Sequence, residues 1–182
     1  PAADRQGLVA HQFVTGAAPG GSEEFAVGGV ENVDASVFDA FDYVALGHIH
    51  SAQEIRGVGT IRYCGAPLAY SVSEAGQEKS VTIAELGKKG EVTVRTVPLS
   101  PLRRLRKIRG SYEELTRRST WQGTAVEDYL QVTLTDEQDI PDAIAKLRSI
   151  YPNILELRYD NARTRAFGEI TAEAEPERRT PM

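Results

Sequence analysis

The 182-residue sequence has very little cysteine and no long apolar run. Its single cysteine, Cys64, cannot form a disulfide within the chain, so a reducing compartment such as the cytoplasm is the expected setting. No segment approaches the roughly 18 consecutive apolar residues that a membrane-spanning helix needs. The charges in residues 1–5 are not followed by the apolar stretch of a secretory signal. The sequence therefore predicts no membrane partner and no disulfide-stabilised secreted domain.

An initiator methionine is also lacking. The chain starts at Pro1 and reaches an apolar segment at residue 7. At the other end, residues 173–182 are mainly charged or polar and contain no recognisable core element. We therefore expect the chain to be a fragment of a longer protein.

The formal net charge of −5 is unevenly distributed. Residues 1–98 carry 7 basic and 12 acidic side chains, whereas residues 99–182 carry 14 of each. Within the second part, residues 102–118 hold seven basic side chains against two glutamates, a local excess of five positive charges. Because polyanions are contacted by patches of charge, the overall acidity does not exclude a nucleic acid as partner.

This basic segment has two interpretations. It can contact DNA phosphates through a group of cationic side chains near its start, namely Arg103, Arg104, Arg106, Lys107 and Arg109. Alternatively, these side chains form the solvated face of a strand whose apolar residues, Leu102, Leu105 and Ile108, point inward. The spacing is not strictly alternating, and we favour the second interpretation.

Hydrophobic periodicity and turn residues predict an α/β chain in two parts. In residues 1–98 we expect buried strands over 7–10 and 43–46, a short helix over 35–41 capped by Asn32 or Asp34, a strand over 60–64, and a hairpin of 79–86 with 91–97. Pro98 and Pro101 mark the boundary. In residues 99–182 we expect strands over 102–108, 129–135 and 154–159, and helices over 112–118, capped by Ser111, and 141–150.

The three histidines, His11, His48 and His50, all follow predicted buried strands. Residues two apart in an extended segment point to the same side, so His48 and His50 can face one site, and Gly47 allows the backbone to turn there. Open α/β sheets place ligands at the carboxyl ends of their strands. Neutral imidazole suits Mn, Zn or Fe better than Mg or Ca. The pattern predicts a metal site.

Structural roles for these histidines are the alternative. A single histidine after a strand is more often a core or loop residue than a ligand. Three imidazoles also cannot hold two metals about 3.5–4 Å apart without a bridging oxygen ligand, and the aspartates Asp34, Asp39 and Asp42 show no spacing that suggests one. Cys64 is expected to be a small buried apolar filler, and Trp121 a core or loop anchor.

A family resemblance narrows these alternatives. Residues 47–50, Gly-His-Ile-His after an apolar strand, resemble the last metal motif of the calcineurin-like metallophosphoesterases. Within that superfamily, residues 8–14, 27–34, 41–50, 61–68 and 78–83 resemble the SbcD family, the nuclease subunits of bacterial SbcCD complexes. The likeness is dense over residues 7–118 and thin beyond them.

The resemblance implies the fold and the site. Residues 1–98 would be the back half of a metallophosphoesterase β-sandwich with flanking helices, and residues 99–182 a small, incomplete α+β capping and DNA-binding domain. His11 and His48 would bind one metal and His50 a second; the intact protein would carry two Mn²⁺ ions, with Mg²⁺ or another divalent metal as alternatives. The bridging aspartate and the acid–base histidine are expected upstream, so no catalytic residue is assigned here and the fragment alone is expected to be inactive.

The implied function is a metal-dependent double-strand DNA exonuclease and single-strand endonuclease. It would act on DNA ends and hairpins in repair and recombination, together with the ATPase subunit SbcC. A homodimer through the missing amino-terminal part is left open. One rival is a calcineurin-like phosphodiesterase for small phosphate esters, against which the second module argues. The other rival is a catalytically inert scaffold or binding fragment.

Overall fold

The computed structural model describes residues 4–18 and 32–166 and divides the chain into two compact units, Pro1–Arg104 and Leu105–Met182. Each unit has a hydrophobic cluster of its own. The chain is of the mixed α/β kind, as the sequence predicts, with several sheets and few helices. None of the helices in the described residues is long and apolar enough to cross a membrane. The assignment of residues 1–98 and 99–182 to a metallophosphoesterase half and a capping domain stays a prediction.

The first unit is built on a four-stranded sheet with the order β1-β4-β6-β5. Its strands are β1 (Gly7–His11), β4 (Tyr43–Gly47), β6 (Val58–Tyr63) and β5 (Gln53–Ile55). The first three run parallel, and β5 returns antiparallel beside β6. Alternate residues of β4, Val44 and Leu46, are buried in the core. The predicted strands over 7–10, 43–46 and 60–64 are thereby confirmed as strands.

Strand β1 is not buried, however, and this part of the prediction is wrong. It lies at the edge of the described sheet, and the side chain of Val9 is 85% exposed. Leu8 and Ala10, which point to the other face, pack against the core. An apolar run shows only that a strand can be buried on both faces, and whether it is depends on the neighbouring elements.

Short elements join these strands. The predicted helix over 35–41 is a single 3-10 turn, η1 (Ala35–Phe38), and Asp34 caps it by accepting from the backbone N–H of Ser36 at 2.8 Å. Strands β2 (Phe13–Val14) and β3 (Asn32–Val33) form a small parallel pair. Tyr63, at the end of β6, donates its hydroxyl to the carbonyl of Gln12 at 2.7 Å and accepts from the N–H of Val14. Burial raises the pKa of this tyrosine.

The predicted hairpin is confirmed as β7 (Ser80–Leu86) and β8 (Val92–Pro98), which pair antiparallel along their whole length. Asp42 fastens its turn to the start of β1. The carboxylate accepts from the ammonium of Lys89 at 2.7 Å, from the backbone N–H of Gln6 at 2.8 Å and from that of Gly90 at 3.1 Å. These donors, the Lys89 side chain foremost, hold the pKa of Asp42 below its ordinary value.

Replacing Asp42 by asparagine is expected to remove a contribution to stability that is present near neutral pH and lost in acid. Because its folded pKa lies below the unfolded value of about 3.9, Asp42 contributes stability above that pH and loses it as the pH falls through the folded pKa. Urea titrations of the wild type and Asp42→Asn should therefore differ most near neutral pH and converge on acidification. In a Lys89→Met background, the stability difference caused by Asp42→Asn should be smaller. A difference between the wild type and Asp42→Asn that is constant from pH 7 to 3 would contradict this role.

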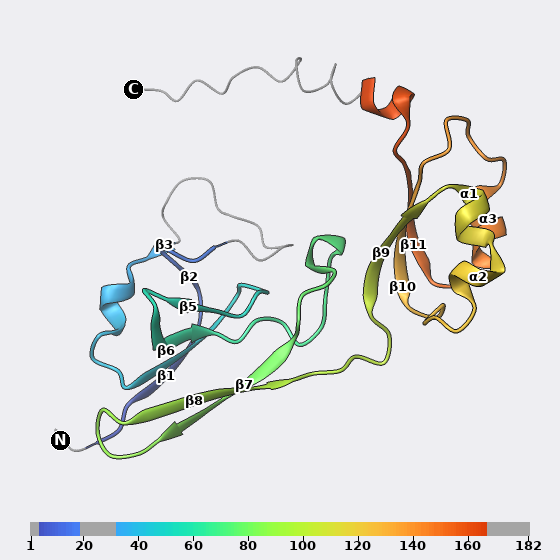
Figure 1. Cartoon of the computed structure of the whole chain (residues 1–182). Helices are drawn as coiled ribbons and strands as arrows, with labels where there is room; N and C mark the ends of the chain where they lie inside the picture. The colour runs from blue at the N-terminus through green and yellow to red at the C-terminus, as the bar shows by residue number, and fades with distance from the viewer. Residues whose placement is uncertain (1–3, 19–31, 167–182) are drawn as a thin grey trace, which may run out of the picture. The chain divides into compact units, whose positions relative to one another are not determined.

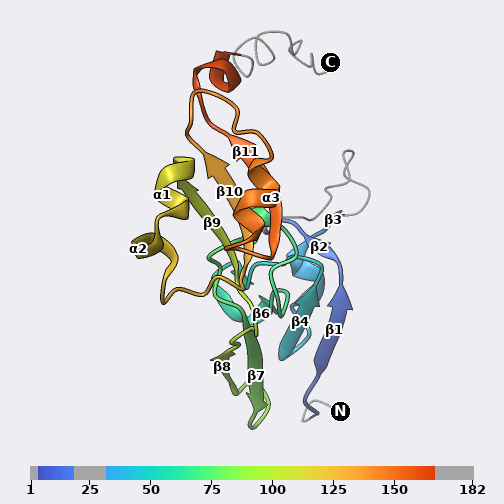
Figure 2. The ribbon, with the colours of Figure 1, turned by 90° about the vertical axis from the view of Figure 1, so that its right-hand side faces the viewer.

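The second unit is a parallel three-stranded sheet with three short helices on one face (Figure 1 and Figure 2). Its strands, in the order β11-β10-β9, are β9 (Leu105–Gly110), β10 (Tyr129–Leu134) and β11 (Ile154–Tyr159). The helices are α1 (Tyr112–Thr116), α2 (Arg118–Trp121) and α3 (Ala143–Arg148). The predicted order of elements is confirmed, but the parallel pairing makes this unit α/β rather than α+β.

Local signals explain most boundaries in this unit. Ser111 caps α1 as predicted, in a reciprocal capping box with Glu114. The predicted helix 112–118 is broken because Arg117 adopts an extended backbone, and the helix predicted over 141–150 begins only at Ala143 because Asp142 has a left-handed φ of 53°. Trp121 packs against the core and donates to the carbonyl of Thr116 at 3.1 Å, which confirms it as an anchor.

Candidate metal site

His11 and His48 lie together at the carboxyl ends of two paired strands. His11 ends β1, where it is in register with Gly47, the last residue of β4, and His48 follows directly. The centroids of the two imidazole rings are 5.5 Å apart and the rings are nearly perpendicular, at 72°. This spacing is compatible with two imidazoles facing one metal ion at nitrogen–metal distances of about 2 Å.

Gly47 makes room for the ring of His11. A Cβ at position 47 would lie 2.9 Å from Nδ1 of His11, closer than real contacts allow, so any side chain there would displace the ring. The backbone does not turn at Gly47 as expected but at His48, whose φ is 104°. Non-glycine residues rarely adopt such a conformation, and those that do are concentrated at functional sites.

The backbone from His48 to His50 is not the extended segment that the sequence suggests, because β4 ends at Gly47 and the φ of His48 is 104°. That His48 and His50 face one site stays a prediction. Between them, Ile49 is buried in the core, 2% exposed. Nδ1 of His50 instead lies 3.0 Å from Oε1 of Glu74, and its ring lies near that of Tyr70, with centroids 5.5 Å apart.

The three histidines supply a suitable but incomplete donor set for a metal. Imidazole nitrogen is the ligand expected for Mn, Zn or Fe. Among residues 4–18 and 32–166, however, no group of three or more His, Cys, Asp or Glu side chains is placed to hold an ion. A two-metal site at these histidines would therefore need oxygen ligands from elsewhere, and the role of His11, His48 and His50 as ligands stays a prediction.

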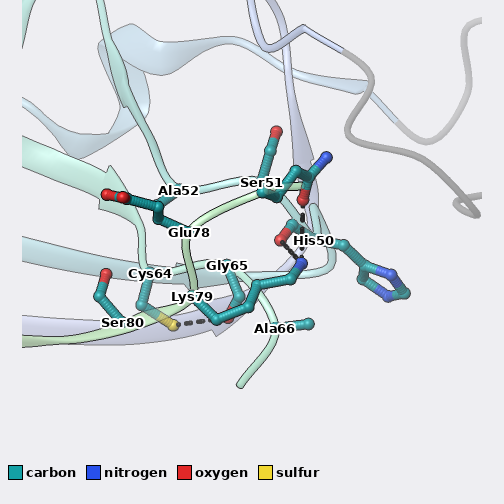
Figure 3. Close-up of a pocket in the computed structure, with 10 residues that line it drawn as sticks. His50, Ser51, Ala52, Cys64, Gly65, Ala66, Glu78, Lys79 and Ser80 are labelled. Carbon is teal, nitrogen blue, oxygen red and sulfur yellow. Dashed lines mark hydrogen bonds between the residues drawn. The ribbon is translucent and has the colours of Figure 1, made fainter. Parts of the chain in front are cut away.

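A pocket of about 240 Å³ lies beside the backbone of His50 (Figure 3). Its lining includes Cys64, Gly65 and the side chain of Lys79, whereas the ring of His50 points away from these residues. Cys64 is exposed, so its prediction as a buried filler is wrong. The strand ends one residue earlier, and Tyr63 takes the buried position.

The predicted phosphate-binding cations differ in their surroundings. Arg106 is occupied within the fold: its Nε donates to Asp128 at 2.7 Å and its guanidinium reaches the carbonyl of Ala125. Lys107 and Arg109, two residues apart on β9, are both exposed, and Arg109 pairs with Asp160 at 2.8 Å.

Arg103 and Arg104 precede the strand, and Nε of Arg103 is a buried atom without a hydrogen-bond partner among the described residues. Leu102 is 93% exposed, so its predicted inward orientation is wrong: β9 begins only at Leu105. Ile108 does pack against the core.

Sequence reasoning missed Glu74 and Lys79. Both are buried, and both contact His50: Glu74 contacts the ring, and Lys79 donates to the backbone carbonyl at 3.1 Å. Glutamate and lysine side chains are ordinarily exposed, whether in an irregular segment, as for Glu74, or at the start of a predicted hairpin strand, as for Lys79. Their only signal was the place of Lys79 within one of the segments that carry the family resemblance.

These features define a mixed α/β protein whose imidazole side chains gather where parallel strands end, the place at which open α/β sheets bind ligands. Residues 101–182 match a family model, SbcD_C, described as the Type 5 capsule protein repressor C-terminal domain. A curated relative from Staphylococcus epidermidis, the SbcD subunit of the nuclease SbcCD, is 36% identical over 151 residues, which make up 82% of this chain and 40% of the relative.

The protein of the same name from Staphylococcus saprophyticus is 37% identical over 151 residues, 82% of this chain and 39% of the relative. The chain belongs to the SbcD family. It spans about two fifths of the length of these curated relatives.

Proposed function

We propose that this chain contributes one side of the active site of a metal-dependent DNA nuclease. The observation that carries the proposal is the placement of His11 and His48 together at the ends of β1 and β4, in a chain similar to nuclease subunits over 82% of its length. The first unit would be the back half of a metallophosphoesterase domain. The second unit would be a capping domain of the same protein.

In this proposal, His11 and His48 bind one Mn²⁺ ion and His50 binds a second. When bound, two such ions supply Lewis acidity that polarises a phosphodiester and activates water for in-line attack. Gly47 leaves the space in which the ring of His11 lies, and the backbone turns at His48, where φ is 104°. The bridging carboxylate and the acid–base histidine would come from the part of the relatives that this chain does not cover, so the chain alone would be inactive.

The proposed substrate is DNA, at double-strand ends and at hairpins, in repair and recombination within the cytoplasm. The proposed partner is the ATPase subunit of the same complex, SbcC. Lys107 is the best candidate for a phosphate contact, because it is exposed on β9 whereas Arg106 is held by Asp128 and the exposed Arg109 is paired with Asp160. A surface of this kind would give a binding affinity that falls with rising salt.

The proposal is tested by Mn²⁺ calorimetry and DNA cleavage with the full-length protein. The wild type should bind about two ions and cut hairpin and double-stranded DNA, whereas the His48→Ala/His50→Ala variant should lose both properties. Ser51→Ala, at the adjacent position, serves as the control. Unchanged binding in the double variant would refute the metal site, and hydrolysis of small phosphate diesters without cleavage of DNA would favour the rival phosphodiesterase.

A further inference from the structure

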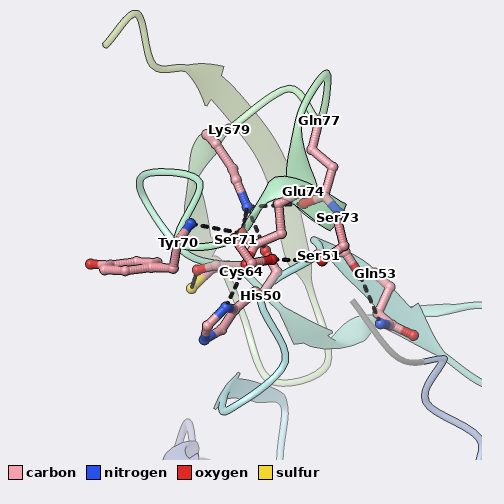
Figure 4. A network of polar contacts seen from close by, with 11 residues as sticks. His50, Ser51, Gln53, Cys64, Tyr70, Ser71, Ser73, Glu74, Gln77 and Lys79 are labelled. Atoms are coloured by element: carbon pink, nitrogen blue, oxygen red, sulfur yellow. Dashed lines mark hydrogen bonds and ion pairs between the residues drawn. The ribbon is translucent and has the colours of Figure 1, made fainter. Parts of the chain in front are cut away.

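A buried ion pair contacts both the ring and the backbone carbonyl of His50 (Figure 4). The side chains of Glu74 and Lys79 are 0% and 7% exposed, and Nζ of Lys79 lies 2.7 Å from Oε2 of Glu74. Buried pairs of this kind generally contribute no more to stability than apolar side chains of similar size, because both charges lose their hydration. The presence of the pair at this place therefore needs an explanation other than stability.

The carboxylate of Glu74 is held in one orientation. Its Oε1 accepts from Nδ1 of His50 at 3.0 Å and from the hydroxyl of Ser71 at 3.3 Å. Its Oε2 accepts from Lys79 at 2.7 Å and from the backbone N–H of Tyr70 at 3.4 Å. A carboxylate has about four acceptor positions, and donors on both of its oxygens hold the plane of this carboxylate in place.

Lys79 completes the arrangement by fixing the backbone. Its ammonium group has three donors, and it donates to Glu74, to Oε1 of Gln77 at 2.9 Å and to the carbonyl of His50 at 3.1 Å. The same carbonyl accepts from the backbone N–H of Ala66 at 3.0 Å. Residues 66–79 thus hold His50 at two points, the backbone carbonyl and the ring nitrogen Nδ1.

We propose that Glu74 is a positioning residue for His50. Glu74 accepts a hydrogen bond from Nδ1–H of His50 and thereby favours the tautomer that carries its proton on Nδ1. In this tautomer Nε2 has the free electron pair that can bind a metal, and Nε2 lies on the side of the ring away from Glu74. Histidines that bind metals commonly donate their second nitrogen to a carboxylate, which sets both the tautomer and the ring orientation. Lys79 keeps the carboxylate in place. The inference rests on the proposed metal-binding role of His50.

The first test is Glu74→Gln in the full-length protein. A glutamine amide has one acceptor and one donor group, so it cannot accept from both His50 and Lys79. The affinity for Mn²⁺ measured by calorimetry should fall about 10–100-fold. In the metal-free protein, nitrogen-15 NMR of the imidazole should show the proton on Nδ1 of His50 in the wild type and shared between both nitrogens in the variant. Gly76→Ala, in the same segment but with no atom within 4 Å of the added methyl, controls for loosening of the loop.

A second variant, Glu74→Met/Lys79→Met, removes both buried charges. It shows whether a loss of Mn²⁺ affinity comes from the lost orientation of the His50 ring or from a less stable fold. It should fold, because neither charge is left uncompensated, yet show the same loss of Mn²⁺ affinity. The proposal is overturned if both variants bind Mn²⁺ like Gly76→Ala and the proton of His50 stays on Nδ1. If His50→Ala itself leaves binding unchanged, the proposed function fails instead, and the NMR result still decides whether Glu74 orients the ring.

Discussion

Replacing Lys79 by methionine is expected to destabilise the first unit by about 3–5 kcal/mol. The side chain of Glu74 is completely buried, and without Lys79 its negative charge would lose the ammonium group that lies 2.7 Å from Oε2. The methionine fills a similar volume, so the loss would come from the uncompensated charge and not from a cavity. Urea titration followed by circular dichroism, with hydrogen exchange of the β4 amides to report on the first unit, measures the effect.

Two companion variants show whether the charge is the cause. Glu74→Met/Lys79→Met should recover most of the lost stability, because it removes the stranded carboxylate as well. Lys88→Met, at an exposed lysine of the hairpin turn, should change stability by no more than about 0.5 kcal/mol. If the double variant were as unstable as Lys79→Met, the loss would reflect packing of the lysine stem and not an unpaired charge.

Replacing Gly65 by alanine is the second large effect. Gly65 has a φ of 79°, and a Cβ there would lie 2.9 Å from the backbone nitrogen of Ala52 and 2.9 Å from the carbonyl oxygen of His50. A left-handed alanine costs about 1–2 kcal/mol, and overpacking adds about 1–3 kcal/mol. Because both obstructing atoms belong to the backbone, no side chain can rotate away, and the segment that carries His50 would have to move.

The matched control is again Gly76→Ala. Gly76 has a φ of 89° but nothing within 4 Å of an added methyl, so it should lose only the conformational part. The difference between the two variants in the urea midpoint therefore isolates the cost of the backbone contact. Equal losses would mean that the loop around His50 is soft enough to accommodate the methyl group.

The strands were the most predictable part of the fold, because their signal is local. Strand β11 matches its predicted range of 154–159, and the hairpin of β7 and β8 follows from alternating β-branched residues around a glycine-bearing turn. The exposure of Val9 and Cys64 could not be predicted in this way. It depends on which elements cover them, and composition carries no information about that.

The histidines of the candidate site could be predicted from the sequence, but the residues that contact and orient them could not. The motif of residues 47–50 identified His48 and His50, and the end of a strand identified His11. Glu74 and Lys79 lie 24 and 29 residues beyond His50 in sequence, and only folding brings them into contact with it. The left-handed turn at His48 was equally hidden, since histidine carries no general preference for a positive φ as large as 104°.

The backbone of His48 also bears on how far this protein can be stabilised. A non-glycine residue in a sparsely populated backbone region raises the free energy of the native state by about 1–3 kcal/mol. Glycine would adopt the φ of 104° without that cost but would remove the imidazole. The sequence most favourable for folding and the sequence required by the proposed chemistry therefore differ at position 48. A library of variants selected only for thermal resistance should drift toward glycine there and lose the imidazole that the proposed metal site requires.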